Sequence, residues 1–307
     1  MWIVIVFGLL VLLGLWINSM IKKTNAYKNF YRAIHVVKDV SEEDRYDVAV
    51  FGSTFSYYAF DLKQYNGHNF SIEPQGMVYL KRTVHHFMEN VKTEGTVVIT
   101  LPGCIFGTEN VMQDEQCLTY YAFLRSDEFE NYNKRNKIKY YLKRYLPICN
   151  PNFLRYLFKD SALTYAIGEG IDEEKALNLA GRRVEGWKRL LGITEKENIV
   201  LPEQAQKTCT KMRRVLDDVI EEIREHNCTP VLLILPMSSA FHEICPREFF
   251  DVLIYDNLAK LESRNVRVLD YLYDEELIKL ENYWTADCLN TKGRRVLTQR
   301  MMKDLEW

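Results

Sequence analysis

The sequence contains few residues that break regular structure, with 14 glycines and 8 prolines among 307 residues. It also lacks internal repeats and low-complexity tracts. These absences exclude a disordered or low-complexity chain. Hydrophobic residues make up 47% of the sequence, which favours a well-packed globule. Once an N-terminal apolar stretch is set apart, the length leaves room for one large α/β domain of about 260 residues.

Charge and cysteine usage exclude several further classes. The formal net charge is −2, which gives no global attraction to nucleic acid. The seven cysteines are scattered and never form a C-x-x-C motif, so neither a disulfide framework nor a zinc site is expected. Free thiols in a reducing compartment are the expectation. The sequence has no metal or dinucleotide signature either, and we expect no cofactor.

One long apolar run stands at the N-terminus. No charged residue interrupts Trp2 to Ile17, and through Ile21 the run reaches the roughly 20 residues that a bilayer requires. A secretory signal peptide would need a basic segment before the run and a small-residue cleavage site after it, and both are lacking. The sequence therefore predicts a retained transmembrane anchor over residues 1–23, followed by a juxtamembrane connector over 24–44.

The charges beside this run predict its orientation. No lysine or arginine precedes it, whereas several follow it: Lys22, Lys23, Lys28, Arg32 and Lys38. Basic flanks stay on the cytoplasmic side of a membrane. We expect a single-pass protein of the cell membrane whose main domain faces the cytoplasm, in agreement with the expectation of free thiols.

Strand and helix patterns alternate over residues 45–307. Short apolar, β-branched runs predict five strands, at 46–51, 68–72, 96–101, 229–235 and 265–269. Apolar residues at helical spacing predict helices at 77–91, 204–226, 247–263 and 291–305. A helical insertion over about 104–200 separates the two halves. The pattern predicts a doubly wound, flavodoxin-like parallel sheet covered on both faces, with ligands binding beyond the carboxyl ends of the strands.

Two segments far apart in the sequence carry the strongest functional signal. Val48-Ala-Val-Phe-Gly-Ser-Thr54 is an apolar strand that leads into a Gly-Ser-Thr turn, and Ala286-Asp-Cys-Leu-Asn-Thr-Lys-Gly293 precedes the last predicted helix. Together they resemble the first and last blocks of the SGNH (GDSL-type) hydrolases, in the membrane-anchored branch from polysaccharide loci. The resemblance covers about residues 45–307 and implies a three-layer α/β fold.

The resemblance also implies roles for particular residues. Aligned on Gly52, the nucleophile is Thr54, with Ser53 as a less favoured choice. Gly76, in Pro74-Gln-Gly-Met, and the Thr54 backbone N–H are the implied oxyanion donors, and Asp287 is the implied residue that orients the base. Cys288 stands where the family has histidine, and the third block's asparagine is missing after Leu101.

These departures leave two interpretations open. A Thr or Ser hydroxyl needs a base to take its proton, and a thiol replaces imidazole poorly. His242 is the best outside candidate for the base, because it follows a predicted strand at its carboxyl end. Cys288 as a nucleophile in its own right is less favoured, since no partner base is evident.

The resemblance therefore implies one of two functions. The first is an esterase or O-acyltransferase that acts on a cell-envelope or capsular glycan. The alternative is a catalytically degenerate SGNH-like protein that binds a glycan or a membrane-bound partner enzyme. Expected partners are the membrane, a glycan or lipid-linked glycan, and that enzyme, but not nucleic acid.

A basic, aromatic stretch runs from Lys134 to Leu146. Ile138, Tyr141, Leu142 and Tyr145 form an apolar stripe at helical spacing, and no acidic residue occurs between Lys134 and Lys159. On a tethered protein this pattern predicts an interfacial helix among anionic head groups. An ordinary amphipathic helix packed on the domain fits it equally well, and a docking surface for an anionic glycan precursor is a weaker option.

Overall fold

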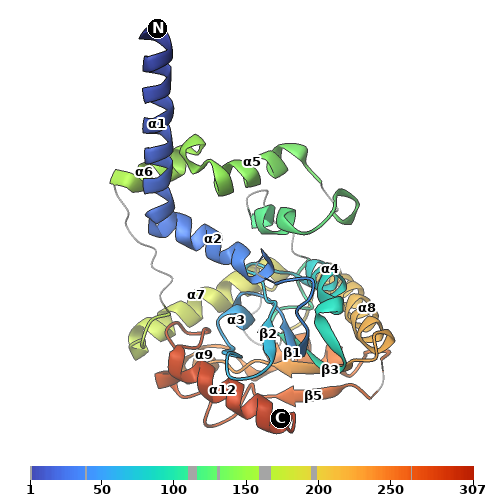
Figure 1. Cartoon of the computed structure of the whole chain (residues 1–307). Helices are drawn as coiled ribbons and strands as arrows, with labels where there is room; N and C mark the ends of the chain where they lie inside the picture. The colour runs from blue at the N-terminus through green and yellow to red at the C-terminus, as the bar shows by residue number, and fades with distance from the viewer. Residues whose placement is uncertain are drawn as a thin grey trace. The chain divides into compact units, whose positions relative to one another are not determined.

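A computed structural model describes residues 2–38, 40–109, 116–129, 132–158, 167–194, 199–263 and 265–307. The chain divides into two compact units, which are described separately (Figure 1). The first, the helical unit, comprises residues 1–40 and 112–166. The second, the α/β unit, comprises residues 41–111 and 167–307. The excursion expected over about 104–200 is thus divided between the two units.

The α/β unit is built on a five-stranded, all-parallel sheet, as the sequence predicts. Its strands are β1 (Tyr46–Phe51), β2 (Gly67–Asn69), β3 (Val91–Leu101), β4 (Thr229–Ile234) and β5 (Arg267–Asp270). They lie in the order β2-β1-β3-β4-β5, which is the order of flavodoxin-like doubly wound sheets. The direction of strand addition therefore reverses between β1 and β3.

Three strand boundaries differ from the expectation for local reasons. β3 begins at Val91 rather than 96 because the register shifts opposite Tyr46–Val48, at a bulge that contains Glu94 with φ 66°. β5 begins after Asn265, whose φ of 59° belongs to a turn. β2 ends at Asn69, although the Phe70 N–H still donates to the Val50 carbonyl at 2.7 Å.

Most expected helices are confirmed, with ends shifted by a few residues. The longer helices of this unit are α4 (Met77–Phe87), α7 (Glu173–Leu191), α8 (Glu203–Glu225) and α12 (Thr291–Asp304). The helix expected at 247–263 is present but ends at Leu258. It runs without a break through α10 (Arg247–Phe250), a π-helical turn (η5, Asp251–Tyr255) and α11 (Asp256–Leu258). The Asn257 side-chain amide donates to the Val252 and Leu253 carbonyls at 3.1 Å, an alternative to the backbone ladder of a regular helix.

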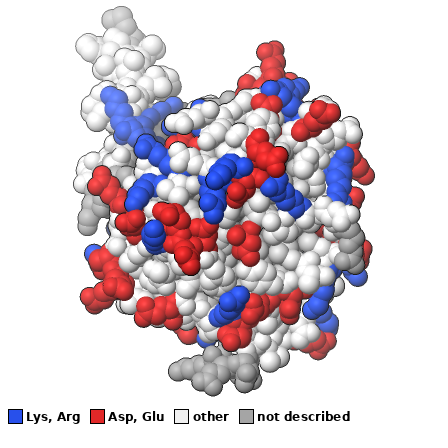
Figure 2. Space-filling view, turned by 90° about the horizontal axis from the view of Figure 1, so that it is seen from below, with Lys and Arg blue, Asp and Glu red and all other residues white. Residues whose placement is uncertain are grey.

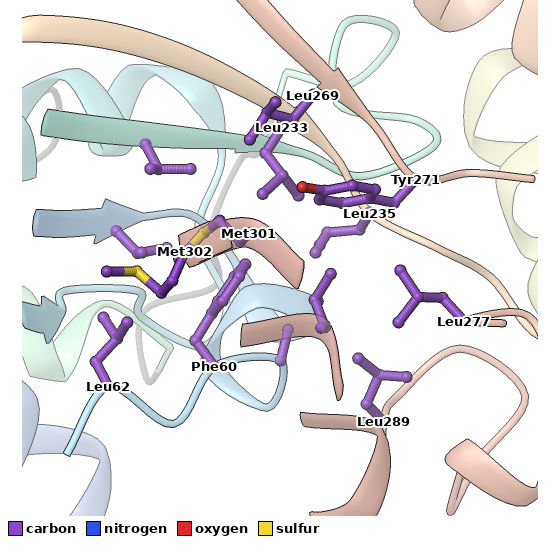
Figure 3. Close-up of a cluster of buried hydrophobic side chains, with 14 of the residues drawn as sticks. Phe60, Leu62, Leu233, Leu235, Leu269, Tyr271, Leu277, Leu289, Met301 and Met302 are labelled. Atoms are coloured by element: carbon purple, nitrogen blue, oxygen red, sulfur yellow. The ribbon is translucent and has the colours of Figure 1, made fainter. Parts of the chain in front are cut away.

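Amphipathic helices cover both faces of the sheet. One face presents alternating residues of four strands, including Val50, Val98, Leu233 and Leu269, to the α12 side chains. Figure 3 shows Met301 and Met302 of α12 among these strand residues, together with Phe60 and Tyr271. On the other side α4 packs against α8. Alternate strand residues are buried on both faces, which explains why the strands read as continuous apolar runs.

The helical unit contains α1 (Trp2–Lys23), α2 (Asn25–Lys38), α5 (Lys134–Tyr145) and α6 (Pro151–Phe158). It also contains the short 3-10 helices η2 (Gln116–Ala122), η3 (Ser126–Glu128) and η4 (Pro147–Cys149). α1 is long and apolar enough to cross a membrane, and most of its side chains are exposed. Its C-terminal end is different, because Ile21 packs in a small cluster with Tyr27 and Phe153. All described cysteines are free, and Cys117 lies outside the described side chains.

The turn after β1 depends on a residue without a side chain. A Cβ at Gly52 would collide with the side chains of Ser56 and Thr100. Those two hydroxyls hydrogen-bond to each other, and the Thr100 hydroxyl also donates to the Phe51 carbonyl at 3.2 Å. Gly52 therefore lets β1 and β3 approach closely where the two strands end.

We predict that Gly52→Ala lowers the free energy of unfolding by about 1–3 kcal/mol, because the added methyl overpacks this turn. The matched control is Gly181→Ala in α7, where a Cβ meets nothing within 4 Å and the change is expected to be neutral or stabilising by up to about 1 kcal/mol. Urea denaturation of the detergent-solubilised chain measures both. Equal stability of the two variants would contradict the account of this turn.

Candidate functional site

A cavity of about 490 Å³ lies at the carboxyl ends of β1 and β3. Its wall includes Ser53 and Thr54, which follow β1, and Pro102 and Cys104, which follow β3. Ligands of doubly wound proteins bind at this reversal of strand order. Residues of α7 and of the segment before α12 complete the wall. A cavity therefore lies where the sequence places the candidate site.

Both candidate hydroxyls of the Gly-Ser-Thr turn line this cavity. Ser53 precedes the short helix α3 (Thr54–Tyr57), and Thr54 is its first residue. Ser53 is buried and Thr54 is half-buried. Within the described chain, no hydrogen-bond partner accepts a proton from either side chain. A hydroxyl without an adjacent base is a weak nucleophile.

Asp287 also lines the cavity, as the resemblance implies. A small loop positions it: Tyr283 and Leu289 form an antiparallel bridge, and the loop between them projects Thr285 and Asp287 into the wall. The Thr285 hydroxyl donates to Asp287 Oδ1 at 2.9 Å and accepts from the Cys288 N–H at 2.9 Å. Local hydrogen bonds therefore fix the direction of the carboxylate.

The partner of the Asp287 carboxylate is an arginine and not an imidazole. Arg183 Nε of α7 donates to Asp287 Oδ2 at 2.5 Å, and only 4% of the Asp287 side chain is exposed. Burial lowers the pKa of Arg183, but the Asp287 charge and hydrogen bond outweigh it, so the pKa is raised overall. The Arg183 guanidinium also lies over the Phe55 ring, 5.6 Å from its centroid. The carboxylate is thus held by a permanent cation that cannot act as a base.

Cys288 does not take the place of the missing histidine. Its side chain is buried and is not among those that line the cavity. Burial raises the pKa of Cys288 well above its ordinary value, and the neighbouring Asp287 charge adds to the effect. The thiol therefore stays protonated near neutrality and behaves as a small apolar side chain.

No described histidine supplies the base. His242 lies on α9 (Ser239–Ile244), where its Nε2 hydrogen-bonds the Leu272 carbonyl at 2.8 Å. Burial lowers the pKa of His242, and the residue is not part of the cavity wall. The histidine side chains described elsewhere lie outside that wall as well. The expectation that His242 serves the site therefore has no geometric support.

Gly76 stands beside the cavity rather than in its wall. It is the N-cap residue of α4, while its neighbours Pro74 and Gln75 line the cavity. The Gln75 amide donates to the Thr83 hydroxyl at 2.7 Å, which ties the segment to α4. The second block of the resemblance thus lies near the first, although it offers a proline and a glutamine to the cavity.

Sequence reasoning missed the contribution of α7. Arg182, Arg183 and Trp187 of this helix line the cavity, yet they lie in the excursion that matched no block. The apolar residues of α7 recur at helical spacing, which identifies a helix in the sequence. This spacing does not indicate that the helix packs beside the cavity. Cys104 was missed too. Burial raises its pKa to about 12, although the nearby Arg183 charge opposes this, so it is no better a nucleophile.

No group of three or more metal-ligating side chains occurs among the described residues. Comparison with models of known protein families gave no match, and comparison with curated protein sequences gave none either. The geometry of the cavity is therefore the basis for inferring its function.

We predict that Arg183→Ala lowers the free energy of unfolding by about 1–3 kcal/mol, because it leaves a buried carboxylate without its cation. Asp287→Asn should restore part of this loss when added to Arg183→Ala, since it removes the unpaired charge. Urea denaturation of the wild type, both single variants and the double variant gives the four free energies of unfolding of a double-mutant cycle. Arg182→Ala, on the same helix but without an ion pair among the described residues, is the control. Additive single effects would contradict a coupled pair.

Proposed function

We propose that this chain is a membrane-anchored, catalytically degenerate SGNH-like protein whose cavity binds an acidic glycan. The observation that carries the proposal is the Arg183–Asp287 pair in a cavity without a described imidazole. In a hydrolase of this kind the aspartate orients a base, and removal of the base typically costs several orders of magnitude in rate. Here the same carboxylate is occupied by a guanidinium, so it holds a binding group in place.

The chemistry of the wall supports an acidic sugar as the ligand. Arg182 and Arg183 stand against the single carboxylate of Asp287, which leaves the wall with one excess positive charge. The Phe55 and Trp187 rings form apolar parts of the wall, with centroids 6.5 Å apart. Guanidinium groups bind carboxylates with directional, charge-assisted hydrogen bonds. Aromatic rings cover the apolar faces of a ligand in such sites.

Contacts at the base of α1 support a retained membrane anchor. Asn18 donates to the Tyr145 carbonyl at 3.2 Å and accepts from the Ile148 N–H at 3.2 Å. Ile21 is fully buried beside Phe153. Cleavage of a signal peptide would remove these groups from the helical unit. The basic residues after α1 and the free thiols favour the cytoplasmic side for the α/β unit.

The face of the molecule drawn in Figure 2 gives no support to a nucleic-acid partner. Figure 2 shows acidic and basic side chains interspersed over one face of the molecule, without a large area of one sign. Nucleic-acid-binding proteins gather lysine and arginine on one face or along one groove. We therefore keep the glycan and the membrane as the proposed partners.

A specific observation favours ester chemistry as the second candidate. Ser53, Thr54 and Asp287 line one cavity, as the nucleophile and the orienting carboxylate of an esterase or O-acyltransferase would. This candidate requires a base that is delivered by the substrate or by another protein. It predicts that hydrolysis of a short-chain ester is lost in Ser53→Ala or Thr54→Ala.

The test is calorimetric titration of the full chain in detergent with a tetrasaccharide of alternating hexuronate and N-acetylhexosamine. We expect binding by the wild type, and a loss of roughly 10- to 100-fold in Arg182→Ala, as for other hydrogen bonds to charged groups. Arg189→Ala is the matched control, because Arg189 is exposed on the same helix but does not line the cavity.

Two results would contradict the proposal. The first is equal affinity for the tetrasaccharide and for its carboxyl-reduced counterpart, since the arginines would then recognise no charge. The second is hydrolysis of p-nitrophenyl acetate by the wild type that disappears in Ser53→Ala or Thr54→Ala, which would favour the second candidate.

A further inference from the structure

The apolar stripe of α5 points away from its own unit. Ile138, Tyr141 and Tyr145 are 59%, 46% and 56% exposed, whereas Asn136 and Tyr140 face inward and are buried. A soluble amphipathic helix would bury its apolar stripe against the protein. The orientation of α5 therefore separates the two interpretations that the sequence left open. Its exposed apolar side chains must therefore be buried by something other than the helical unit.

Hydrogen bonds fix the depth of α5 relative to α1. The apolar part of α1 from Trp2 to Ile17 is about 24 Å long at 1.5 Å per residue, about one helical turn shorter than the hydrocarbon core of a bilayer, about 30 Å. Asn18 follows this part directly, and its amide holds the Tyr145 carbonyl and the Ile148 N–H. The C-terminal end of α5 thus lies at the level where α1 leaves the hydrocarbon.

A second contact ties the same end of α5 to the chain beyond α1. The Tyr27 hydroxyl of α2 donates to the Arg144 carbonyl at 2.7 Å. The Lys143 ammonium lies over the Phe30 ring and the Arg144 guanidinium over the Tyr31 ring, at 5.8 and 5.1 Å from the centroids. Several independent contacts therefore attach α5 to the segment that follows α1.

Charge complementarity identifies the surface that covers this stripe. Basic residues occur along the whole of α5, at Lys134, Arg135, Lys137, Lys139, Lys143 and Arg144, and the helix contains no acidic residue. Tyrosine is enriched at the boundary between lipid and water, and basic side chains are attracted to anionic head groups. An acidic protein partner would match the sign of this charge but would not account for the level of α5 beside Asn18.

We propose that the α5 face, defined as Ile138, Tyr141, Tyr145 and Leu146, lies in the head-group region of an anionic phospholipid bilayer. α1 and α5 then hold the protein at the membrane together: α1 spans the bilayer, and α5 lies along its surface. This proposal rests on the membrane anchor proposed above. It adds a second contact with the lipid to that of α1.

The experiment is photo-crosslinking of the full chain in nanodiscs of phosphatidylcholine and phosphatidylglycerol. Tyr141→p-benzoylphenylalanine and Tyr145→p-benzoylphenylalanine probe the α5 face. The same residue at Leu12 of α1 tests the span, and at Val200, an exposed position of the α/β unit, it gives the background. Mass spectrometry counts lipid adducts. We expect adducts at positions 12, 141 and 145, at least about fivefold above those at position 200, as at an interfacial site.

The outcomes separate the two proposals. Adducts at position 12 with only background at 141 and 145 would overturn the α5 contact and leave the anchor intact. Background at position 12 as well would overturn the anchor, and the α5 contact with it. Protein adducts at 141 and 145 in place of lipid would identify a protein partner and also overturn the proposal. Yields at 141 and 145 that do not fall in pure phosphatidylcholine would overturn the preference for anionic lipid.

Discussion

The close pairing of β1 with β3 is the constraint on which the candidate site depends. These strands stand where the order of the sheet reverses, so the segments that follow them diverge and leave a cavity between them. Gly52 permits the close approach of β1 and β3, because it has no Cβ to collide with Ser56 and Thr100. The hydrogen bond between the Ser56 and Thr100 hydroxyls links the turn after β1 to β3. Ser53 and Thr54 follow Gly52 directly and line the cavity. The same packing that completes the core thus presents the two hydroxyls.

The ion pair between Arg183 and Asp287 decides what this cavity can do. Asp287 comes from the loop before α12 and Arg183 from α7, so the pair joins two segments of the wall that are far apart in the sequence. A carboxylate in this position supports catalysis when it orients an imidazole. With a guanidinium as its partner, it instead directs a cation that is available to an anionic ligand. Under the proposed function, this cation recognises the acidic groups of the ligand.

Much of the fold could be predicted from the sequence, but less of the site. The apolar runs at 46–51 and 229–235 are visible because both faces of their strands are buried, and Gly52 and Asp287 lie in segments with a recognisable pattern. The partner of Asp287 was not predictable, because Arg183 lies 104 residues away in an excursion without a matching motif. The burial of Cys288 depends on how one loop folds. The outward stripe of α5 depends on contacts of Asn18 with residues more than 120 positions later.

The central claim is that the cavity presents hydroxyls without activating them. The most direct measurement is intact-protein and peptide mass spectrometry after treatment with a fluorophosphonate, which reacts with nucleophilic hydroxyls that a neighbouring base has activated. A serine esterase treated in parallel controls for the reagent. The account predicts no phosphonyl adduct on Ser53 or Thr54 under conditions that label the control fully. An adduct on either residue that is lost in Ser53→Ala or Thr54→Ala would contradict it.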